Sequence, residues 1–215
     1  MKKLGATAFA VLMIFAHLFA DDVVYKIGEE GPGGGIVFYY SKAGFPVKNP
    51  LSLTPKICHY LECSAVDIGH LPWCSQKNSK SKCCNVAENN YGIDNVGKGF
   101  INTVNILKAE HKDGELTILN CAAKACSAYF TGTTKPGEWY LPNILELELI
   151  KDNLVKTGII IDKNRFYWSS SQPPDTDPDT GSIYVYYVIF NNESREFFHT
   201  ISKNDWCYVR AVRAF

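Results

Sequence analysis

Sequence segments typical of β-strands lie near both ends of this chain, and they constrain its fold more than any other feature. A glycine-rich turn at residues 31–35 leads into a β-branched and aromatic run at residues 36–40. The chain closes on a second strand-like run at residues 207–215, in which Arg210 and Arg213 fall on opposite faces. We therefore expect the first and last strands to pair, an arrangement that favours a binding scaffold over a catalytic one.

The first twenty residues have the layout of a secretory signal peptide. Lys2 and Lys3 make a positive start, an apolar run covers residues 4–15, and Ala20 supplies a small residue at the expected cut. A retained membrane anchor is the alternative, but a spanning helix needs about 20 apolar residues. We expect residues 1–20 to be removed, leaving no transmembrane segment and an exported protein that is periplasmic, cell-surface or secreted.

The remaining residues, 21–215, suit one domain with a substantial core. Without the two lysines of the signal peptide, 20 basic residues face 22 acidic ones, so the mature chain carries a charge of −2. That balance supplies no electrostatic footprint for nucleic acid and no broad basic face for anionic lipid. We expect no nucleic-acid partner, and the sequence leaves the oligomeric state open.

Eight cysteines in an exported chain predict a fold stabilised by disulfides. Sequence does not fix their pairing, since eight cysteines allow 105 connectivities. Cys121 and Cys126 share a predicted helix, where a mutual bond would be strained, so each is expected to reach a loop cysteine or Cys207. Adjacent Cys83 and Cys84 are expected to bond to different partners. The disulfide candidates are Cys58, Cys63, Cys74, Cys83, Cys84, Cys121, Cys126 and Cys207.

Helical spacing appears in the middle of the chain. Residues 41–96 read as mostly irregular structure interrupted by prolines, and helices are predicted at residues 98–110 and 120–130, the second with Asn120 as its N-cap. A third helix starts with a capping box of Asn143 and Glu146, buries Leu147, Ile150 and Leu154, and stops at Gly158.

From residue 166 onward the period changes to two. Residues 183–190 are apolar on both faces, which predicts a strand covered on both sides. Residues 191–194 read as a turn, and residues 195–201 as the returning strand of an antiparallel hairpin.

Five strings in order resemble one family, the C-terminal domain of the Lcl collagen-like adhesin, catalogued as a domain of unknown function. They are Gly34-Gly35-Ile36-Val37-Phe38-Tyr39, Asn102-Thr103 before a helix, Trp139-Tyr140-Leu141-Pro142, Tyr167-Trp168-Ser169-Ser170-Ser171 and Val209-Arg210-Ala211-Val212-Arg213-Ala214-Phe215. The resemblance covers nearly all of residues 33–215, and the cysteine-rich segment from Cys58 to Cys84 departs from it.

The family is similar in fold to C-type lectins and the formylglycine-generating enzyme. The resemblance implies an α+β, C-type-lectin-like fold with a twisted antiparallel sheet, paired N- and C-terminal strands and flanking helices. It also implies a binding or adhesion-type protein whose loops contact glycans or extracellular proteins. A secreted or periplasmic enzyme and an envelope-associated structural protein are the alternatives.

We expect no enzyme, because no complete catalytic constellation stands out. Ser169–Ser171 lack a Gly-x-Ser-x-Gly elbow and are expected to be structural. The possible bases His59, His70, His111 and His199 have no evident orienting partner.

The candidate ligand-binding residues are Asp175, Asp177, Asp179 and Trp206. The three aspartates alternate as calcium ligands do, yet Thr180 and Tyr186 stand at the EF-hand positions for Gly and Glu. A solvated acidic loop is therefore favoured over a calcium site, and no other cofactor is expected.

Four further features have competing interpretations. Cys58, Cys63, His70 and Cys74 have the ligand types of a zinc site, but export favours disulfides. Trp139, Trp168 and Trp206 suit a sugar-stacking surface, although buried core positions are favoured. The glycine run precedes a strand and lacks Gly-Lys-Ser/Thr, so we expect a permissive turn and no phosphate loop. Arg210 and Arg213 are expected to pair with buried carboxylates or backbone carbonyls.

Overall fold

The structure is a computed structural model that describes residues 24–74, 95–111, 121–160, 164–173, 183–191 and 199–215. Within these ranges the chain forms two β-sheets and three α-helices, which confirms the α+β class. The predicted signal peptide, the turn at residues 192–194, Cys83, Cys84 and the aspartates Asp175, Asp177 and Asp179 lie outside the described residues.

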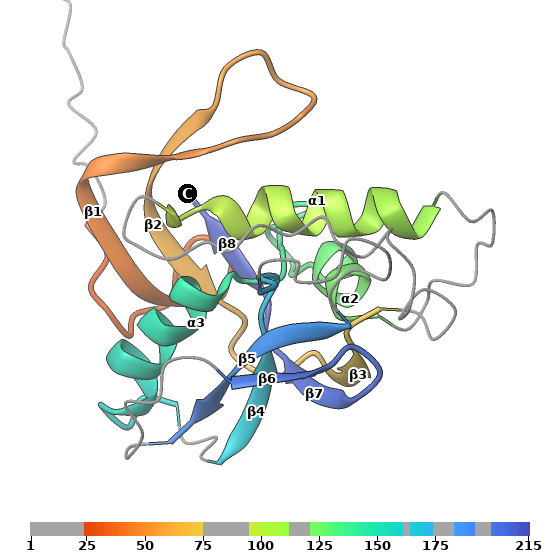
Figure 1. Cartoon of the computed structure of the whole chain (residues 1–215). Helices are drawn as coiled ribbons and strands as arrows, with labels where there is room; N and C mark the ends of the chain where they lie inside the picture. Colours follow the sequence, from red (N-terminus) through yellow and green to blue (C-terminus); the bar gives the residue numbers. More distant parts are fainter. Residues whose placement is uncertain (1–23, 75–94, 112–120, 161–163, 174–182, 192–198) are drawn as a thin grey trace, which may run out of the picture.

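The first sheet brings the two ends of the chain together, although not by direct pairing. Its antiparallel strands are β1 (Ile36–Val47), β2 (Lys56–Cys63) and β8 (Val212–Ala214), in the order β1-β2-β8. The prediction that the first and last strands pair is wrong, because β2 lies between them. The β1–β2 hairpin supplies the backbone partners that a lone terminal strand would lack (Figure 1).

Residues 41–96 contain more regular structure than the prolines and cysteines suggest. β1 continues to Val47, and β2 and β3 (Gly69–Pro72) follow it. Pro46 lies inside β1, where an edge strand tolerates a residue without a backbone donor. Prolines therefore marked an edge strand here and not an irregular segment.

The second sheet has the order β3-β7-β4-β5-β6. It contains β4 (Arg165–Trp168), β5 (Tyr184–Phe190), β6 (His199–Ser202) and β7 (Trp206–Val209). The predicted hairpin is confirmed, since β5 and β6 pair antiparallel from Tyr184 to Tyr187. β4 and β7 are parallel, so the expectation of a wholly antiparallel sheet is wrong.

The predicted last strand is two strands in different sheets. It breaks after β7 at Arg210 and Ala211 and resumes as β8. The Arg210 side chain is fully buried and donates to the carbonyls of Ser64 and Ala65 at 2.9 and 3.3 Å. Arg210 therefore bonds to the segment after β2 at the point where the chain leaves the second sheet and enters the first.

All three predicted helices exist. α1 spans Lys98–His111, and α2 spans Ala122–Ala128 with Cys121 as its N-cap, so the assignment of that cap to Asn120 is wrong. α3 spans Ile144–Ile150 and begins with the predicted Asn143–Glu146 capping box. A π-helical segment, Lys151–Val155, then carries the chain to Gly158, whose φ of 80° ends the helix as predicted.

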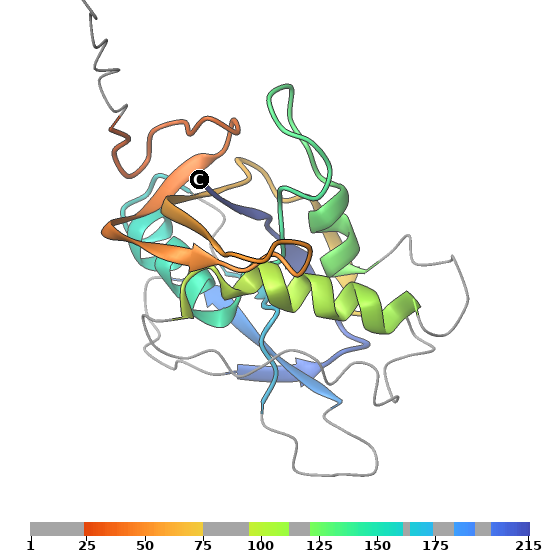
Figure 2. The same ribbon diagram turned by 90° about the horizontal axis from the view of Figure 1, so that it is seen from above.

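The helices join the two sheets into one body. α3 contacts β1 of the first sheet and β5 of the second, whereas α2 packs on β3 and β7 (Figures 1 and 2). Trp139 and Trp168 are buried in the core cluster that also holds α2, which confirms their predicted core role. No helix in the described ranges has the length and apolar character to span a membrane.

Candidate functional site

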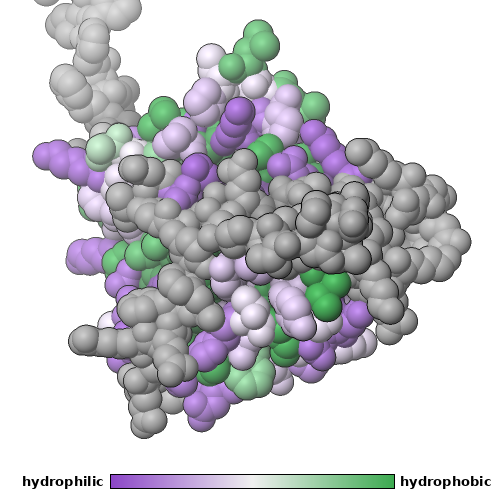
Figure 3. Space-filling model, in the orientation of Figure 1, coloured by the Kyte–Doolittle hydropathy of each residue, from purple (hydrophilic) through white to green (hydrophobic). Residues whose placement is uncertain are grey.

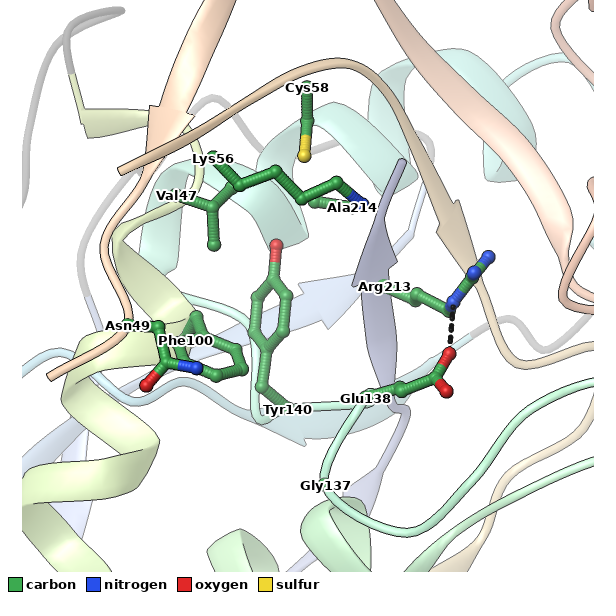
Figure 4. A pocket seen from close by; sticks show the side chains of 10 residues that line it. All are labelled: Val47, Asn49, Lys56, Cys58, Phe100, Gly137, Glu138, Tyr140, Arg213 and Ala214. Atoms are coloured by element: carbon green, nitrogen blue, oxygen red, sulfur yellow. Dashed lines mark hydrogen bonds and ion pairs between the residues drawn. The ribbon is translucent and has the colours of Figure 1, made fainter. Parts of the chain in front are cut away.

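A groove separates the β1–β2 connection from α1. It consists of two adjoining cavities of about 420 and 290 Å³ that share Asn49, Phe100, Gly137 and Tyr140 as lining residues. The walls come from the β1–β2 hairpin, α1 as far as Lys108, the segment that precedes α3, and β8, and Ser127 of α2 also contributes. Figure 4 shows the Tyr140 ring standing between Phe100 and the side chains of β8.

The two ends of the groove differ in chemistry. Lys56, Arg213 and Glu138 line the first cavity, where they place charge at the wall. Val104, Leu107 and other apolar side chains make up most of the lining of the second cavity, to which Lys108 and Thr103 also contribute. Such a groove accommodates an elongated ligand with a polar or acidic group at one end and an apolar portion at the other.

Arg213 is fixed from two sides. Its Nη1 donates to Glu62 Oε1 at 2.5 Å, and its Nε donates to Glu138 Oε2 at 3.2 Å (Figure 4). Glu62 is fully buried and also accepts from the backbone N–H groups of Gly33 and Gly35 at 3.1 and 3.0 Å. The prediction that Arg213 pairs with a buried carboxylate is confirmed, and the same contacts fix a cation at the groove wall.

The glycine run near the N-terminus is explained by Glu62. It forms the predicted turn, with Gly34 at φ 74°. A Cβ added at Gly31 or Gly33 would overlap the Glu62 carboxylate, and one at Gly35 would overlap the Cys63 carbonyl and the Trp139 ring. Glycine is therefore required for close approach as much as for backbone freedom. Sequence alone showed the turn but not the buried carboxylate that it surrounds.

A second buried carboxyl, Glu146, fixes the aromatic wall. It accepts from the N–H groups of Gly97 and Asn143, each at 2.8 Å, and from the Tyr140 hydroxyl at 3.4 Å. Burial raises the pKa of Glu146 to about 7, although these hydrogen bonds oppose the rise. Burial also raises the pKa of Tyr140 well above its usual value. A neutral hydroxyl and a largely neutral thiol, Cys58, therefore face each other across the groove (Figure 4).

A separate aromatic surface lies where the N-terminal segment meets the first sheet. Tyr60 stacks on Phe215 with centroids 5.3 Å apart, Tyr40 lies 4.7 Å from Tyr60, and Tyr25 meets both Tyr60 and Phe215 edge-on. A shallow cavity of about 500 Å³ opens over these rings. The stack fastens both chain ends to the β1–β2 hairpin.

Of the predicted binding residues, Trp206 is the one that lies within the described ranges. Trp206 is 54% exposed at the start of β7, so the expectation that it is buried in the core is wrong. Its ring lies 5.9 Å from the ring of His70, and it lines neither groove cavity. A role for it in binding, like that of the acidic loop, stays a prediction.

The serine string is structural, as predicted. Ser169, Ser170 and Ser171 are fully buried. The Ser169 hydroxyl donates to the Tyr186 carbonyl at 2.8 Å, and the Ser171 hydroxyl accepts from the Ile144 N–H at 3.1 Å. These contacts tie β4 to β5 and α3.

Arg210 also has its predicted structural role. Its Nη2 donates to Asp67 Oδ1 at 2.6 Å, and Arg165 and the Tyr167 hydroxyl contact the same carboxylate at 2.6 and 2.9 Å. This network joins the segment after β2 to β4 and to the junction of β7 and β8.

The six cysteines in the described ranges are all buried. Cys74, Cys121, Cys126 and Cys207 fall in one core cluster. Among the described residues no three His, Cys, Asp or Glu side chains converge as metal ligands, so the suggested zinc set of Cys58, Cys63, His70 and Cys74 does not assemble. The prediction of disulfides stays a prediction.

Sequence reasoning missed most of the groove. Asn49 and Lys56 fall in the segment predicted to be irregular. Glu138 precedes the Trp139-Tyr140-Leu141-Pro142 motif and has no binding signal of its own in the sequence. The available signal for a hairpin was a loop bounded by prolines, with Val47 before it and Lys56 and Cys58 after it.

Comparison with known families gives no further identification. No protein-family model matches the chain, and no curated protein matches it significantly.

Proposed function

We propose that this chain is an exported binding or adhesion-type domain that captures its ligand in the groove between the β1–β2 connection and α1. The observation that carries the proposal is the groove itself, because Arg213 at its charged end is held by buried Glu62 and its other end is mostly apolar. Preorganised polar groups beside an apolar wall are typical of ligand sites. We take the ligand to be an extracellular glycan or protein segment.

The proposal includes a C-type-lectin-like scaffold. Three features support it: the ordered strings shared with the Lcl C-terminal domain, the predicted signal peptide, and an α+β body in which both chain ends enter one sheet. Two connections between strands, the groove-lining residues 49–51 and the acidic loop from Gln172 to Gly181, would then display the binding groups.

The test is an immobilised panel of glycans and extracellular-matrix proteins probed with the mature chain. We expect binding with a Kd in the micromolar range or tighter. Lys56 is exposed at the groove, so Lys56→Glu should weaken binding at least about tenfold while preserving the fold. Lys42→Glu, an exposed site outside the groove, is the matched control and should bind as the wild type does. No binding across the panel, or equal losses in both variants, would reject the proposal.

A further inference from the structure

The connection between β1 and β2 exposes two leucines at the end of a projecting hairpin. Leu51 and Leu53 are 96% and 105% exposed. The connection extends beyond the body of the protein in Figure 1, and Figure 3 shows apolar residues at this extremity. We call residues 48–56 the hairpin tip. Isolated surface leucines are ordinary, but two on one convex tip are a concentrated apolar exposure.

The hairpin tip is ordered by its own hydrogen bonds. The Leu51 N–H donates to Asn49 Oδ1 at 2.9 Å, the Ser52 N–H donates to the Asn49 carbonyl at 3.0 Å, and the Ser52 hydroxyl donates to a carbonyl within the tip. Pro50 and Pro55 have no backbone N–H. The N–H groups of Leu51 and Ser52 therefore keep their partners when the tip leaves water.

The exposed part of the hairpin is also basic, because its one acidic residue, Glu62, is fully buried and paired with Arg213. Residues 31–61 contain Lys42, Lys48 and Lys56 and no Asp or Glu, in a chain with 22 acidic residues. All three lysines are exposed, and none forms an ion pair with a described residue. Lys48 and Lys56 flank the two leucines on either side. Charge is thus segregated onto this hairpin even though the mature chain is nearly neutral.

We propose that the hairpin tip docks the protein on a bilayer that contains anionic phospholipid. Leu51 and Leu53 enter the boundary between head groups and acyl chains, while Lys48 and Lys56 meet the lipid phosphates. This arrangement joins apolar burial to electrostatic attraction, as interfacial anchors do. A convex tip with two leucines offers too little area for a stable protein interface, which buries about 1,200 Å² or more. Leu51 and Lys56 also line the groove, whereas Leu53 and Lys48 line neither cavity, so substitutions at Leu53 and Lys48 distinguish lipid docking from ligand capture.

Vesicle partitioning of the mature chain tests the proposal. We expect binding to vesicles of phosphatidylcholine with phosphatidylglycerol, and weaker binding to phosphatidylcholine alone. Leu53 lines no part of the groove, so Leu53→Ser should lower the partition coefficient at least about tenfold without changing ligand capture. Lys48→Gln should lower it about fivefold on the anionic vesicles only. Val66→Ser removes a 63% exposed side chain outside the hairpin tip and should change nothing.

Three outcomes would overturn lipid docking. One is no partitioning into either vesicle. Another is equal partitioning by Leu53→Ser and the wild type. The third is a Leu53→Ser variant that keeps its lipid affinity but loses ligand capture, because the tip would then be a cover for the groove or a protein contact.

Discussion

Two buried glutamates explain where glycine stands in this chain. Glu62 is surrounded by the turn at residues 31–35, and Glu146 is approached by Gly97 and Gly99 at the start of α1. At Gly31, Gly33 and Gly99 the carboxylate occupies the space that a Cβ would need, whereas Gly97 lies against β1. The capping box made the position of Glu146 predictable from sequence, whereas the role of Glu62 depends on three segments meeting and was not predictable.

The glycine turn gives a prediction at the scale of one methyl group. Gly33→Ala would push a Cβ into Glu62 Oε1 and toward Arg213, so we expect the free energy of unfolding to fall by about 2 kcal/mol. Gly132→Ala is the control, because a Cβ there meets nothing within 4 Å. Urea denaturation of both variants measures the difference, and equal stabilities would show that the turn adapts.

Glu146 gives a prediction about pH. Its pKa is about 7 in the folded protein and 4.5 as the reference value for an unfolded chain. Between these values the folded state holds a proton that the unfolded state has lost, so this group stabilises the fold fully below about pH 4.5. That contribution is lost as pH rises through 7, roughly 3 kcal/mol in all.

Denaturation at a series of pH values checks this sign. Relative to Glu146→Gln, the wild type should lose stability steadily between about pH 4.5 and 7. A difference between the two proteins that does not change with pH would contradict the raised pKa.

At the scale of elements, local patterns predicted helices better than sheet order. α1, α2 and α3 follow from spacing and capping, and the β5–β6 hairpin follows from its period of two. β2 was missed because prolines and cysteines surround it. The split of the last strand into β7 and β8 depends on Arg210 meeting carbonyls far away in sequence, which no local pattern reports.

That split can be tested through the Arg210 contacts. Arg210→Met leaves the Ser64 and Ala65 carbonyls and part of the Asp67 carboxylate without their donor, so we expect a loss of about 3 kcal/mol of unfolding free energy. Lys156→Met breaks the exposed ion pair with Asp152 and should cost less than about 1 kcal/mol. Equal effects in chemical denaturation would mean that the buried network contributes little.

The acidic loop gives the second prediction at this scale. Replacing Asp175, Asp177 and Asp179 with Asn should change the unfolding free energy by no more than about 0.5 kcal/mol per site, as expected for exposed positions. If the loop binds ligand or calcium, the same triple substitution should weaken that binding. Calorimetry with calcium and with the captured ligand measures both. A large loss of thermal stability with unaltered binding would make the loop structural.

For the whole molecule, strands at both ends correctly indicated that the two ends meet. The predicted partner of the last strand was wrong: β8 pairs with β2, because β2 already lies beside β1 in the hairpin. Arg213 and Phe215 nevertheless fasten the C-terminus to the N-terminal turn and to Tyr25. The two ends of the chain are therefore joined by side-chain contacts as well as by strand pairing.

Disulfides would reinforce this closure from inside the core. Cys74 follows β3, Cys121 and Cys126 belong to α2 and its N-cap, and Cys207 lies in β7, yet all four share one buried cluster. Bonds among such distant segments close long loops, and each is expected to stabilise the fold by about 2–4 kcal/mol. We predict that exported protein contains disulfides, and that reduction lowers its melting temperature.

Alkylation of denatured material followed by mass spectrometry, with and without prior reduction, counts the free thiols. Because buried thiols react only after unfolding, finding all eight alkylated without reduction would exclude disulfides and leave the cluster as apolar packing.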